Sequence, residues 1–289
     1  MNYQALISAY FPELPIQTLT PVEEGWGSFV LEVNGEYIFR FPRRPEIHIS
    51  LEKEIRLLPE LAQALTLPVP QFEHIRCGGA GPIQSFVRYR KIPGVALSQD
   101  LLRSGLIARQ LAEFLSELHK FPVERAVLLG IQAASPLEWR AGYVEFYAWV
   151  RQQVFPRVDQ PAQEWTTRVW ESFLNDPENF HFQPALIHAD LGPEHVLCDL
   201  EQGCVTGIID WEDAAIGDPA LDFVGLYAVG GSDFVQQILD WYRVPVEESF
   251  WRRIQFYLSI FPFHEIRFGL YCGGEAHLEQ GLQYLKGKD

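Results

Sequence analysis

The stretch that decides the fold is residues 185–223, ALIHADLGPEHVLCDLEQGCVTGIIDWEDAAIGDPALDF. It contains three short apolar runs, 185–187, 196–198 and 205–209. Polar or turn-forming residues bound each run, a pattern typical of buried strands. Asp190 then lies on a loop after the first strand and Asp210 at the end of the third. Catalytic groups are commonly presented on loops that a rigid scaffold holds.

The residue types in this stretch suit phosphoryl transfer. Moving a γ-phosphoryl group needs a carboxylate that accepts the proton of the attacking hydroxyl, and oxygen ligands that hold Mg²⁺ against the phosphates. Asp190 suits the first task and Asp210 the second. Taken singly, a buried Asp or His is often only a hydrogen-bonded part of a core, and we expect His188 to brace its loop. The ordered set makes a nucleotide-dependent kinase the leading hypothesis.

The order of these motifs resembles the catalytic and metal-binding loops of the aminoglycoside phosphotransferase family, antibiotic kinases with a protein-kinase-like fold. The members that phosphorylate the 2''-hydroxyl of aminoglycosides share the most with it, and macrolide phosphotransferases share fewer of the motifs. The shared motifs are 187–190, 195–197, 207–210, 213–216 and 218–223.

The resemblance implies an α+β, bilobal, protein-kinase-like fold with a small β-rich N-lobe and a larger, mostly helical C-lobe. It makes Asp190 the catalytic base and Asp210 a Mg²⁺ ligand, with His195 as a candidate second ligand. Many family members have Asn where His195 stands, because an amide oxygen suits hard Mg²⁺ better than imidazole does. The 2''-aminoglycoside and macrolide kinases resemble this chain in having His there.

Upstream, two strand-like runs, 29–33 and 36–41, are joined by Asn34-Gly35, a dipeptide that favours a two-residue hairpin. The loop before them contains Gly25, Gly27 and Ser28. A glycine pair before a strand is usually only a turn. In the resemblance, this loop covers the nucleotide phosphates, because small residues let backbone N–H groups approach them.

Arg40 lies between two aromatics of the second hairpin strand. The resemblance makes it the cation that holds the α- and β-phosphates, a position where Lys is commonest, and pairs it with Glu54 on the next helix. An arginine fork suits carboxylate and phosphate. A surface Arg on a strand edge is the ordinary alternative, and Glu52 competes if the register slips. We expect this helix to start after Ser50 as N-cap and to end or kink at Pro59.

A second strand pair, 72–76 and 83–91, leads to a boundary at Ile92-Pro93-Gly94. Within it, Phe86 and Arg88 lie in a stretch that resembles the connector whose backbone binds the adenine or guanine edge. We expect a nucleotide-binding N-lobe over 1–92 and a catalytic and substrate-binding C-lobe over 93–289. Apolar periodicity predicts helices in the C-lobe at 105–120, 136–154, 164–174, 220–229, 233–242, 247–261 and 263–286.

A polycationic acceptor would need several carboxylates around the cleft. Besides Asp190, the candidate substrate residues are Glu194, Glu212, Asp213 and Glu265. Each acid alone is more ordinary as a solvated group or helix cap. Trp241, Trp251 and Tyr257 could stack on sugar rings, although at helical spacing such residues usually belong to a core.

Composition narrows the class of protein. The net charge of −15 disfavours nucleic acid and anionic membranes and suits a cationic substrate, although many acidic proteins owe their charge to solubility alone. No signal peptide or membrane-spanning run is recognisable. The four cysteines lack CxxC spacing and are expected to be small buried hydrophobes. We expect a cytoplasmic monomer.

The sequence therefore predicts a kinase that uses Mg²⁺ and ATP or GTP to phosphorylate a hydroxyl of a small cationic molecule, with an aminoglycoside favoured. A macrolide kinase would use the same chemistry with a more apolar cleft. A non-catalytic nucleotide-binding relative would bind nucleotide without turnover. A metal-dependent hydrolase built on His188, Asp190 and His195 would leave Arg40 and Glu54 without a role.

Overall fold

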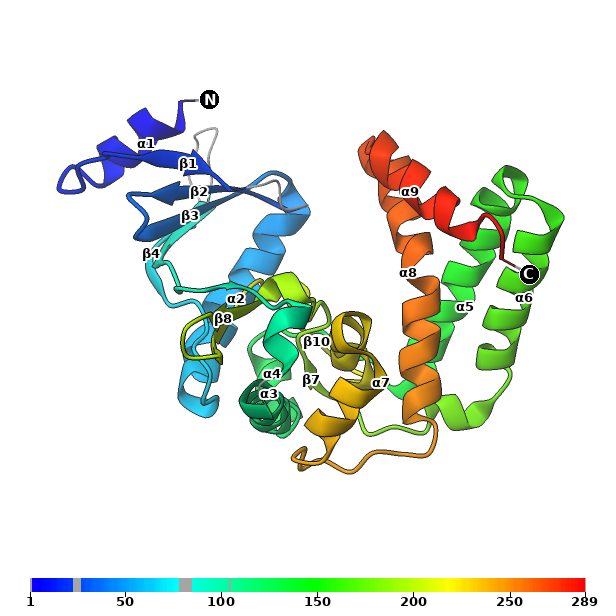
Figure 1. Ribbon diagram of the computed structural model, residues 1–289. Helices are drawn as coiled ribbons and strands as arrows, with labels where there is room; N and C mark the ends of the chain where they lie inside the picture. The colour runs from blue at the N-terminus through cyan, green and yellow to red at the C-terminus, as the bar shows by residue number, and fades with distance from the viewer. Residues whose placement is uncertain (1, 23–26, 78–84, 104, 289) are drawn as a thin grey trace.

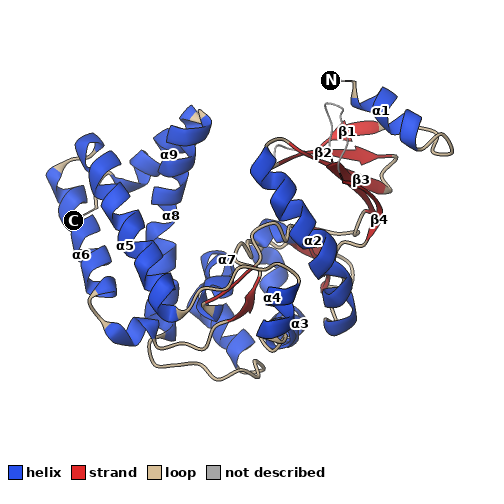
Figure 2. Cartoon of the chain, turned by 180° about the vertical axis from the view of Figure 1, so that it is seen from behind, coloured by secondary structure: helices blue, strands red, loops and turns tan. Residues whose placement is uncertain are grey.

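A computed structural model describes residues 2–22, 27–77, 85–103 and 105–288 of the chain. Figure 1 shows a small lobe, built on one sheet, beside a larger and mostly helical lobe that carries both short sheets. Seen from behind in Figure 2, helix α2 (Pro45–Ala64) runs between them. The predicted mixed fold, with a β-rich N-terminal part and a helical C-terminal part, is confirmed.

The small lobe is an antiparallel sheet of five described strands in the order β1-β2-β3-β5-β4. The strands are β1 (Leu19–Pro21), β2 (Ser28–Val33), β3 (Tyr37–Pro42), β4 (Phe72–Cys77) and β5 (Ser85–Arg90). Helix α1 (Tyr3–Tyr10) contributes Ile7 to an apolar core with Phe39, Phe41 and Phe86. Alternation along β3 therefore places Phe39 and Phe41 on the core face and Arg40 on the other face.

The predicted hairpin turn is present between β2 and β3. Asn34 and Gly35 both have positive φ, 57° and 71°, which the Asn-Gly dipeptide tolerates better than most. The strand after the turn begins at Tyr37, one residue later than predicted, because Glu36 N–H closes the turn on the Val33 carbonyl. The Asn34 side chain also accepts hydrogen bonds from the backbone N–H groups of Gln17 and Thr18, which ties the preceding segment to this turn.

Helix α2 is longer than the sequence predicted. It begins at Pro45 instead of after Ser50, since Pro is well tolerated in the first helical turn, and it continues through Pro59 to Ala64. The predicted start was therefore wrong, and the helix does not end at Pro59. The second half of α2 packs Leu57, Leu58 and Leu61 into the core of the large lobe. The free energy gained by this packing offsets the cost of the backbone hydrogen bond that Pro59 cannot donate.

The three strands predicted in the central stretch are confirmed as β7 (Ala185–Ile187), β8 (Val196–Asp199) and β9 (Cys204–Ile208). Strand β7 pairs with β10 (Ala215–Gly217), and β8 lies between β9 and β6 (Val95–Ala96). Asp190 follows β7 on a loop and Asp210 follows β9 closely, as predicted.

The described part of the large lobe is otherwise helical. Its α-helices are α3 (Gly105–Leu118), α4 (Val123–Leu128), α5 (Pro136–Gln153), α6 (Gln160–Leu174), α7 (Val224–Leu239), α8 (Phe250–Cys272) and α9 (Glu275–Leu285). Short 3-10 turns lie at Gln99–Arg103, Phe155–Arg157, Pro177–Phe180, Pro193–His195 and Pro219–Phe223. In Figure 1, α5, α6, α8 and α9 stand together as a bundle on the side of the large lobe away from α2.

Two predicted helix boundaries are wrong near the C-terminus. The predicted break at Pro262 is absent, because α8 runs through it as one helix of 23 residues. The chain breaks instead at Gly273, whose φ of 73° is the left-handed conformation that ends helices. The predicted gap near residue 231 survives as a kink in α7, where Gly231 has φ of 67°.

The large-lobe core is rich in aromatics. Trp170 and Trp211 are fully buried, and Phe173 stacks on Phe256 with ring centroids 3.6 Å apart. Of the cysteines, Cys198 is buried as predicted, but Cys272 is exposed at the end of α8; Cys77 lies outside the described side chains. Within the described residues, every helix is too short or too polar to cross a membrane.

Candidate functional site

Arg40 is the centre of the small-lobe side of the site. It is 5% exposed, and its Nη1 atom donates to Oε2 of Glu54 on α2 at 2.7 Å. Glu54 is 1% exposed whereas Glu52 is exposed, so the structure brings Arg40 and Glu54 together and leaves Glu52 out. Burial alone would lower the pKa of Arg40, but Glu54 and the other nearby carboxylates outweigh it and raise that pKa.

The other terminal nitrogen of Arg40 reaches the large lobe. Its Nη2 atom lies 3.1 Å from Oε2 of Glu212 and 3.6 Å from Oδ1 of Asp210. Burial and the neighbouring Asp210 raise the pKa of Glu212 to about 7, although Arg40 opposes the shift. Glu212 was predicted to bind substrate, yet the structure places it against Arg40.

The loop of Gly27 and Ser28 lies at the same place. A Cβ atom built on Gly27 would stand 2.6 Å from both carboxylate oxygens of Glu212, so only glycine leaves room for this contact. Ser28 is 4% exposed, and its hydroxyl has no hydrogen-bond partner among the described residues. Gly25, predicted in the same loop, lies outside the described residues.

The loop that carries Asp190 has an unusual backbone. Ala189 has φ of 68°, a conformation that non-glycine residues rarely adopt and that is often found at functional sites. The Asp222 carboxylate holds this conformation by accepting the backbone N–H groups of His188 at 2.9 Å and Ala189 at 2.8 Å. His188 is fully buried, and its Nε2 atom lies 2.9 Å from the carbonyl oxygen of Ile209. His188 therefore braces the loop, as expected.

His195 lies between the two principal carboxylates. Its Nδ1 atom is 2.6 Å from the backbone oxygen of Asp190, and its Nε2 atom is 3.6 Å from Oδ2 of Asp210. Asp210 also has a positive φ, of 64°. Burial lowers the pKa of His195, but Asp210 and the Asp190 backbone oxygen raise it by more, so the net pKa is raised.

Asp190 faces the open side of this cluster, with 56% of its side chain exposed. Partial burial and the neighbouring acids raise its pKa to about 6, against the opposing charge of His195. The shift leaves Asp190 ionised at neutral pH while bringing it closer to the range in which a carboxylate accepts a proton readily.

The Asp210 carboxylate is the donor that fits a hard cation which also binds phosphate. Asp210 supplies carboxylate oxygens, and His195 supplies a ring nitrogen 3.6 Å from one of them. Among the residues that the structure describes, no three His, Cys, Asp or Glu side chains converge on one metal position. Mg²⁺ takes one or two protein carboxylates and completes its shell with water and substrate phosphates, so the carboxylate of Asp210 suits it.

The remaining predicted acids separate into two groups. Glu194 and Asp213 are exposed, and both act on the pKa of Asp190, so they lie beside it. Glu265 lies elsewhere: it is 8% exposed on α8, and its Oε2 atom is 2.5 Å from Nδ1 of His277 on α9. The structure does not bring Glu265 to this cluster.

Phe86 and Arg88 also lie apart from the cluster. Phe86 belongs to the aromatic core of the small lobe, and the Arg88 guanidinium stacks 4.3 Å from the ring centroid of Phe11. Both residues are in β5, whose backbone is paired with β3 on one side and β4 on the other. Arg88 is paired on both sides, so its backbone is not free to bind a nucleotide base, whereas Phe86 pairs with β4 and its assignment to the connector stays a prediction.

Two residues near the cluster were not assigned a role from the sequence. Asp222 belongs to the 218–223 motif, but the sequence does not indicate its hydrogen bonds to the Asp190 loop. Nε2 of His119 also lies 3.1 Å from Oδ2 of Asp222. Tyr89 on β5 is 7% exposed, and its pKa is raised by burial and by the charges of Asp210 and Glu54, with Arg40 opposing. The signal available in the sequence was an aromatic residue three positions before the predicted lobe boundary at residue 92.

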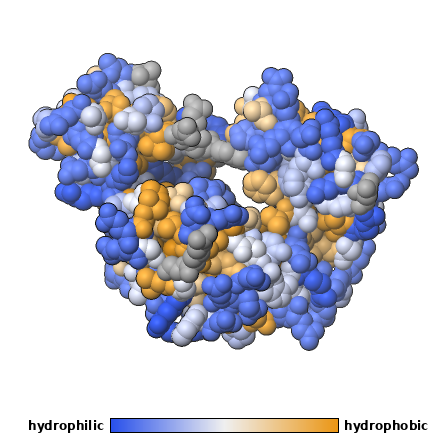
Figure 3. Space-filling view, viewed as in Figure 1, coloured by the Kyte–Doolittle hydropathy of each residue, from blue (hydrophilic) through white to orange (hydrophobic). Residues whose placement is uncertain are grey.

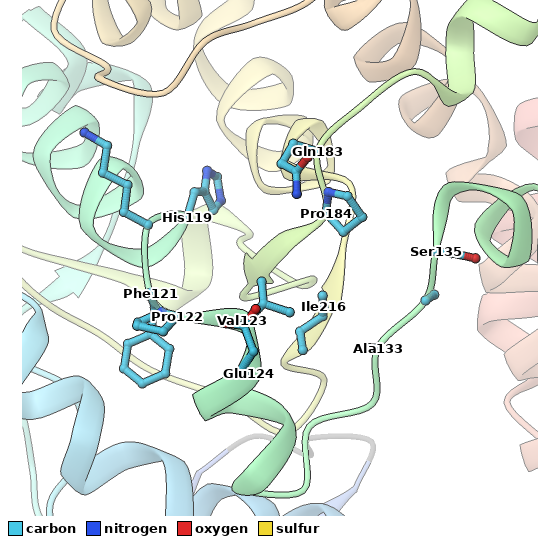
Figure 4. Close-up of a pocket in the computed structure, with 12 residues that line it drawn as sticks. His119, Phe121, Pro122, Val123, Glu124, Ala133, Ser135, Gln183, Pro184 and Ile216 are labelled. Atoms are coloured by element: carbon cyan, nitrogen blue, oxygen red, sulfur yellow. The ribbon is translucent and has the colours of Figure 1, made fainter.

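A cavity lies at the other end of β7 from the Asp190 loop. It measures about 490 Å³ and is lined by His119, Gln183, Pro184, Ile216 and residues of the α3–α4 turn (Figure 4). None of the acids described above lines it. The candidate site is instead the cluster around Arg40 and Asp210, where the two lobes meet. Figure 3 shows in space-filling form that the molecule is hollowed between its lobes.

The architecture and the cluster together define the class: a bilobal, kinase-like protein with carboxylates from the large lobe facing a buried arginine–glutamate pair of the small lobe. The family model described as the phosphotransferase enzyme family matches residues 18–257. The chain belongs to this family.

Individual relatives agree with this assignment. The chain is 32% identical to viomycin phosphotransferase from Streptomyces vinaceus over 155 residues, 52% of each protein. It spans about half the length of the curated relatives it matches.

Solved structures match over nearly the whole chain. The GDP and kanamycin complex of APH(2")-IIia is 31% identical with a TM-score of 0.89, covering 99% of this chain and 97% of that one. Macrolide 2'-phosphotransferase type I is 24% identical with a TM-score of 0.82, over 99% and 97%, and shows likeness of fold alone.

Proposed function

We propose that this protein transfers the γ-phosphoryl group of ATP or GTP to a hydroxyl group of a small cationic molecule, with an aminoglycoside as the favoured acceptor. The observation that carries the proposal is the meeting of the two lobes at Asp210. Arg40, anchored on Glu54, reaches Asp210 from the small lobe, and His195 links Asp210 to the Asp190 loop. Phosphoryl transfer needs this combination of cation, metal-binding carboxylate and base.

In the proposed reaction, the acceptor hydroxyl oxygen attacks the γ-phosphorus and the bond from that phosphorus to the β–γ bridging oxygen breaks. The hydroxyl proton passes to the Asp190 carboxylate, and a nucleoside diphosphate leaves. The exposed side of Asp190 faces the acceptor, and its raised pKa of about 6 suits a group that takes and returns a proton near neutral pH.

The nucleotide is assigned to the small-lobe side. Arg40 and the backbone at Gly27 and Ser28 hold its phosphates, and the base is bound after β5, close to the proposed lobe boundary at residue 92. Asp210 would hold Mg²⁺, with His195 as a second donor, and the metal would neutralise charge on the phosphates. Tyr89, buried beside Arg40, forms part of the wall.

The acceptor is assigned to the large-lobe side. Asp190, Glu194 and Asp213 form an acidic edge that suits ammonium groups. A solved relative binds kanamycin together with GDP, and a second relative is named for viomycin, which supports an antibiotic acceptor. We also propose that the protein acts as a monomer in the cytoplasm, without nucleic-acid or membrane partners.

One panel experiment tests the proposal. Purified protein with Mg²⁺ and either ATP or GTP is assayed for nucleoside diphosphate release in the presence of aminoglycosides, viomycin-type peptides and macrolides. We expect acceptor-dependent release with at least one cationic acceptor and a product heavier by one phosphate in mass spectrometry. Absence of release with every acceptor and both nucleotides would refute the proposed function.

A further inference from the structure

Glu212 occupies a place that the proposed function assigns to the nucleotide. Its carboxylate lies 3.1 Å from Arg40 Nη2, the terminal nitrogen that Glu54 does not use. The same carboxylate stands 2.6 Å from the Cβ position of Gly27. It thus lies between Arg40 and Gly27, the two small-lobe features to which the proposed function assigns the nucleotide phosphates.

The contact is well enclosed. The Glu212 side chain is 17% exposed and that of Arg40 is 6% exposed. A charge-assisted hydrogen bond that is shielded from water is worth more than a surface ion pair. Releasing Glu212 from Arg40 therefore has a substantial free-energy cost.

The charges around Arg40 also indicate that Glu212 opposes the binding of phosphate. The guanidinium faces three carboxylates, those of Glu54, Asp210 and Glu212. Glu54 is the most buried of the three, and its 2.7 Å bond makes it the fixed partner. A phosphate that approaches Arg40 meets the Glu212 carboxylate, which repels it and fills the space beside Gly27.

We propose that Glu212 is an intramolecular anion that stands in for nucleotide phosphate on Arg40 and must leave before nucleotide binds. The proposal rests on the proposed function, since it concerns the same site. It makes Glu212 a residue that sets nucleotide affinity instead of a substrate-binding residue, and it gives Gly27 a second purpose, which is to leave room for this carboxylate.

The direct test is nucleotide affinity in Glu212→Gln, which keeps the side-chain shape but removes the negative charge. Dissociation constants for GDP and for ADP are measured by calorimetry at about pH 8.5, above the pKa of about 7 of Glu212, so that its carboxylate is ionised. EDTA is present so that the metal does not contribute. We expect nucleotide to bind about tenfold more tightly than in the unaltered protein, because binding no longer has to break the charge-assisted hydrogen bond between Glu212 and Arg40. Glu201→Gln, an exposed acid in the β8–β9 turn, makes the same change in net charge, and we expect it to leave the affinity within about twofold.

The outcomes are distinguishable. Unchanged or weaker nucleotide binding in Glu212→Gln, with binding in the unaltered protein, overturns the role of Glu212 and leaves the proposed function standing. Absence of nucleotide binding in every protein, both in EDTA and with Mg²⁺, overturns both. If nucleotide binds only with Mg²⁺, the same comparison of Glu212→Gln with the unaltered protein is made with Mg²⁺. Crystal structures with and without GDP add an independent readout: we expect the Glu212–Arg40 contact only in the nucleotide-free form, and a complex that retains it beside bound phosphate contradicts the inference.

Discussion

Ala189 and Asp210 show at the level of single residues how the site is prepared. Both are non-glycine residues with positive φ, 68° and 64°. Ala189 directly precedes Asp190, and Asp210 itself carries a carboxylate of the cluster. Such conformations persist only where surrounding contacts hold them. At Ala189 the holding contact is the Asp222 carboxylate, which accepts two consecutive backbone N–H groups. The orientation of Asp190 therefore depends on a residue that does not face the cleft.

The pH dependence of activity follows from Asp190. In the proposed reaction its carboxylate must be ionised to accept the hydroxyl proton, and its pKa is raised to about 6. We therefore expect kcat/KM to be highest above pH 6 and to fall about tenfold per pH unit below it. Initial rates between roughly pH 4.5 and 8 check this, and a flat profile between pH 5 and 7 would exclude Asp190 as the base.

Among the helices, α8 shows best what sequence patterns reveal and what they miss. Periodicity located helical residues on both sides of Pro262, but a proline normally ends a helix, so one helix was predicted as two. Tertiary packing decided otherwise, since Phe263 and Ile266 beyond the proline are fully buried in the core of the large lobe. Gly273 does end α8 through its positive φ, but in the sequence it is only one of two adjacent glycines.

A buried ion pair anchors α8 to the central stretch. Arg253 Nε donates to Asp218 Oδ2 at 2.8 Å, and both side chains are completely buried. Replacing Arg253 with Met leaves the Asp218 charge without its cation, so we expect a loss of about 3–5 kcal/mol in the free energy of unfolding. Urea unfolding followed by fluorescence measures this loss.

The neighbouring residue is a matched control. Arg252 pairs with Asp176 at 3.4 Å, with side chains 53% and 35% exposed. Arg252→Met should therefore change stability by no more than about 1 kcal/mol. Equal effects of the two substitutions would contradict the assignment of the Asp218–Arg253 pair as a structural anchor.

The part of the candidate site that adjoins the predicted strands could be predicted from the sequence. Asp190, His195 and Asp210 meet because the strands that precede them, read from short apolar runs, lie in one region of the large lobe. Glu212 and Glu265 could not be placed in this way, because their positions depend on contacts with Arg40 and His277 from distant segments. The sequence does not show which residue a carboxylate will pair with, and only the folded structure does.

At the scale of the whole molecule, two lobes meet around a cleft with an acidic edge. Besides the Arg40 contacts, Arg44 of the small lobe donates to the Sγ atom of Cys272 at the end of α8, at 3.3 Å. This contact joins the small lobe to the helical bundle. The net charge of −15 adds an attractive field for a cationic acceptor.

Salt should therefore weaken the capture of a cationic acceptor. Raising ionic strength from roughly 0.05 to 0.5 M shortens the screening length to a few ångströms, so we expect kcat/KM for an aminoglycoside to fall several-fold. Once the acceptor is bound, steering no longer matters, and kcat at saturation should change little. Steady-state kinetics at constant pH separate the two parameters, and a salt-independent kcat/KM would rule out electrostatic capture.

The most direct test of the central claim is the effect of Asp190→Asn on turnover and on nucleotide binding, measured on the same preparation. Asn keeps the size of the side chain but cannot accept the proton, so we expect kcat for acceptor phosphorylation to fall about 10²–10⁴-fold while GDP and ADP affinities stay within about threefold. Asp233→Asn, an exposed acid on α7, should retain full activity. Undiminished turnover in Asp190→Asn would contradict the account.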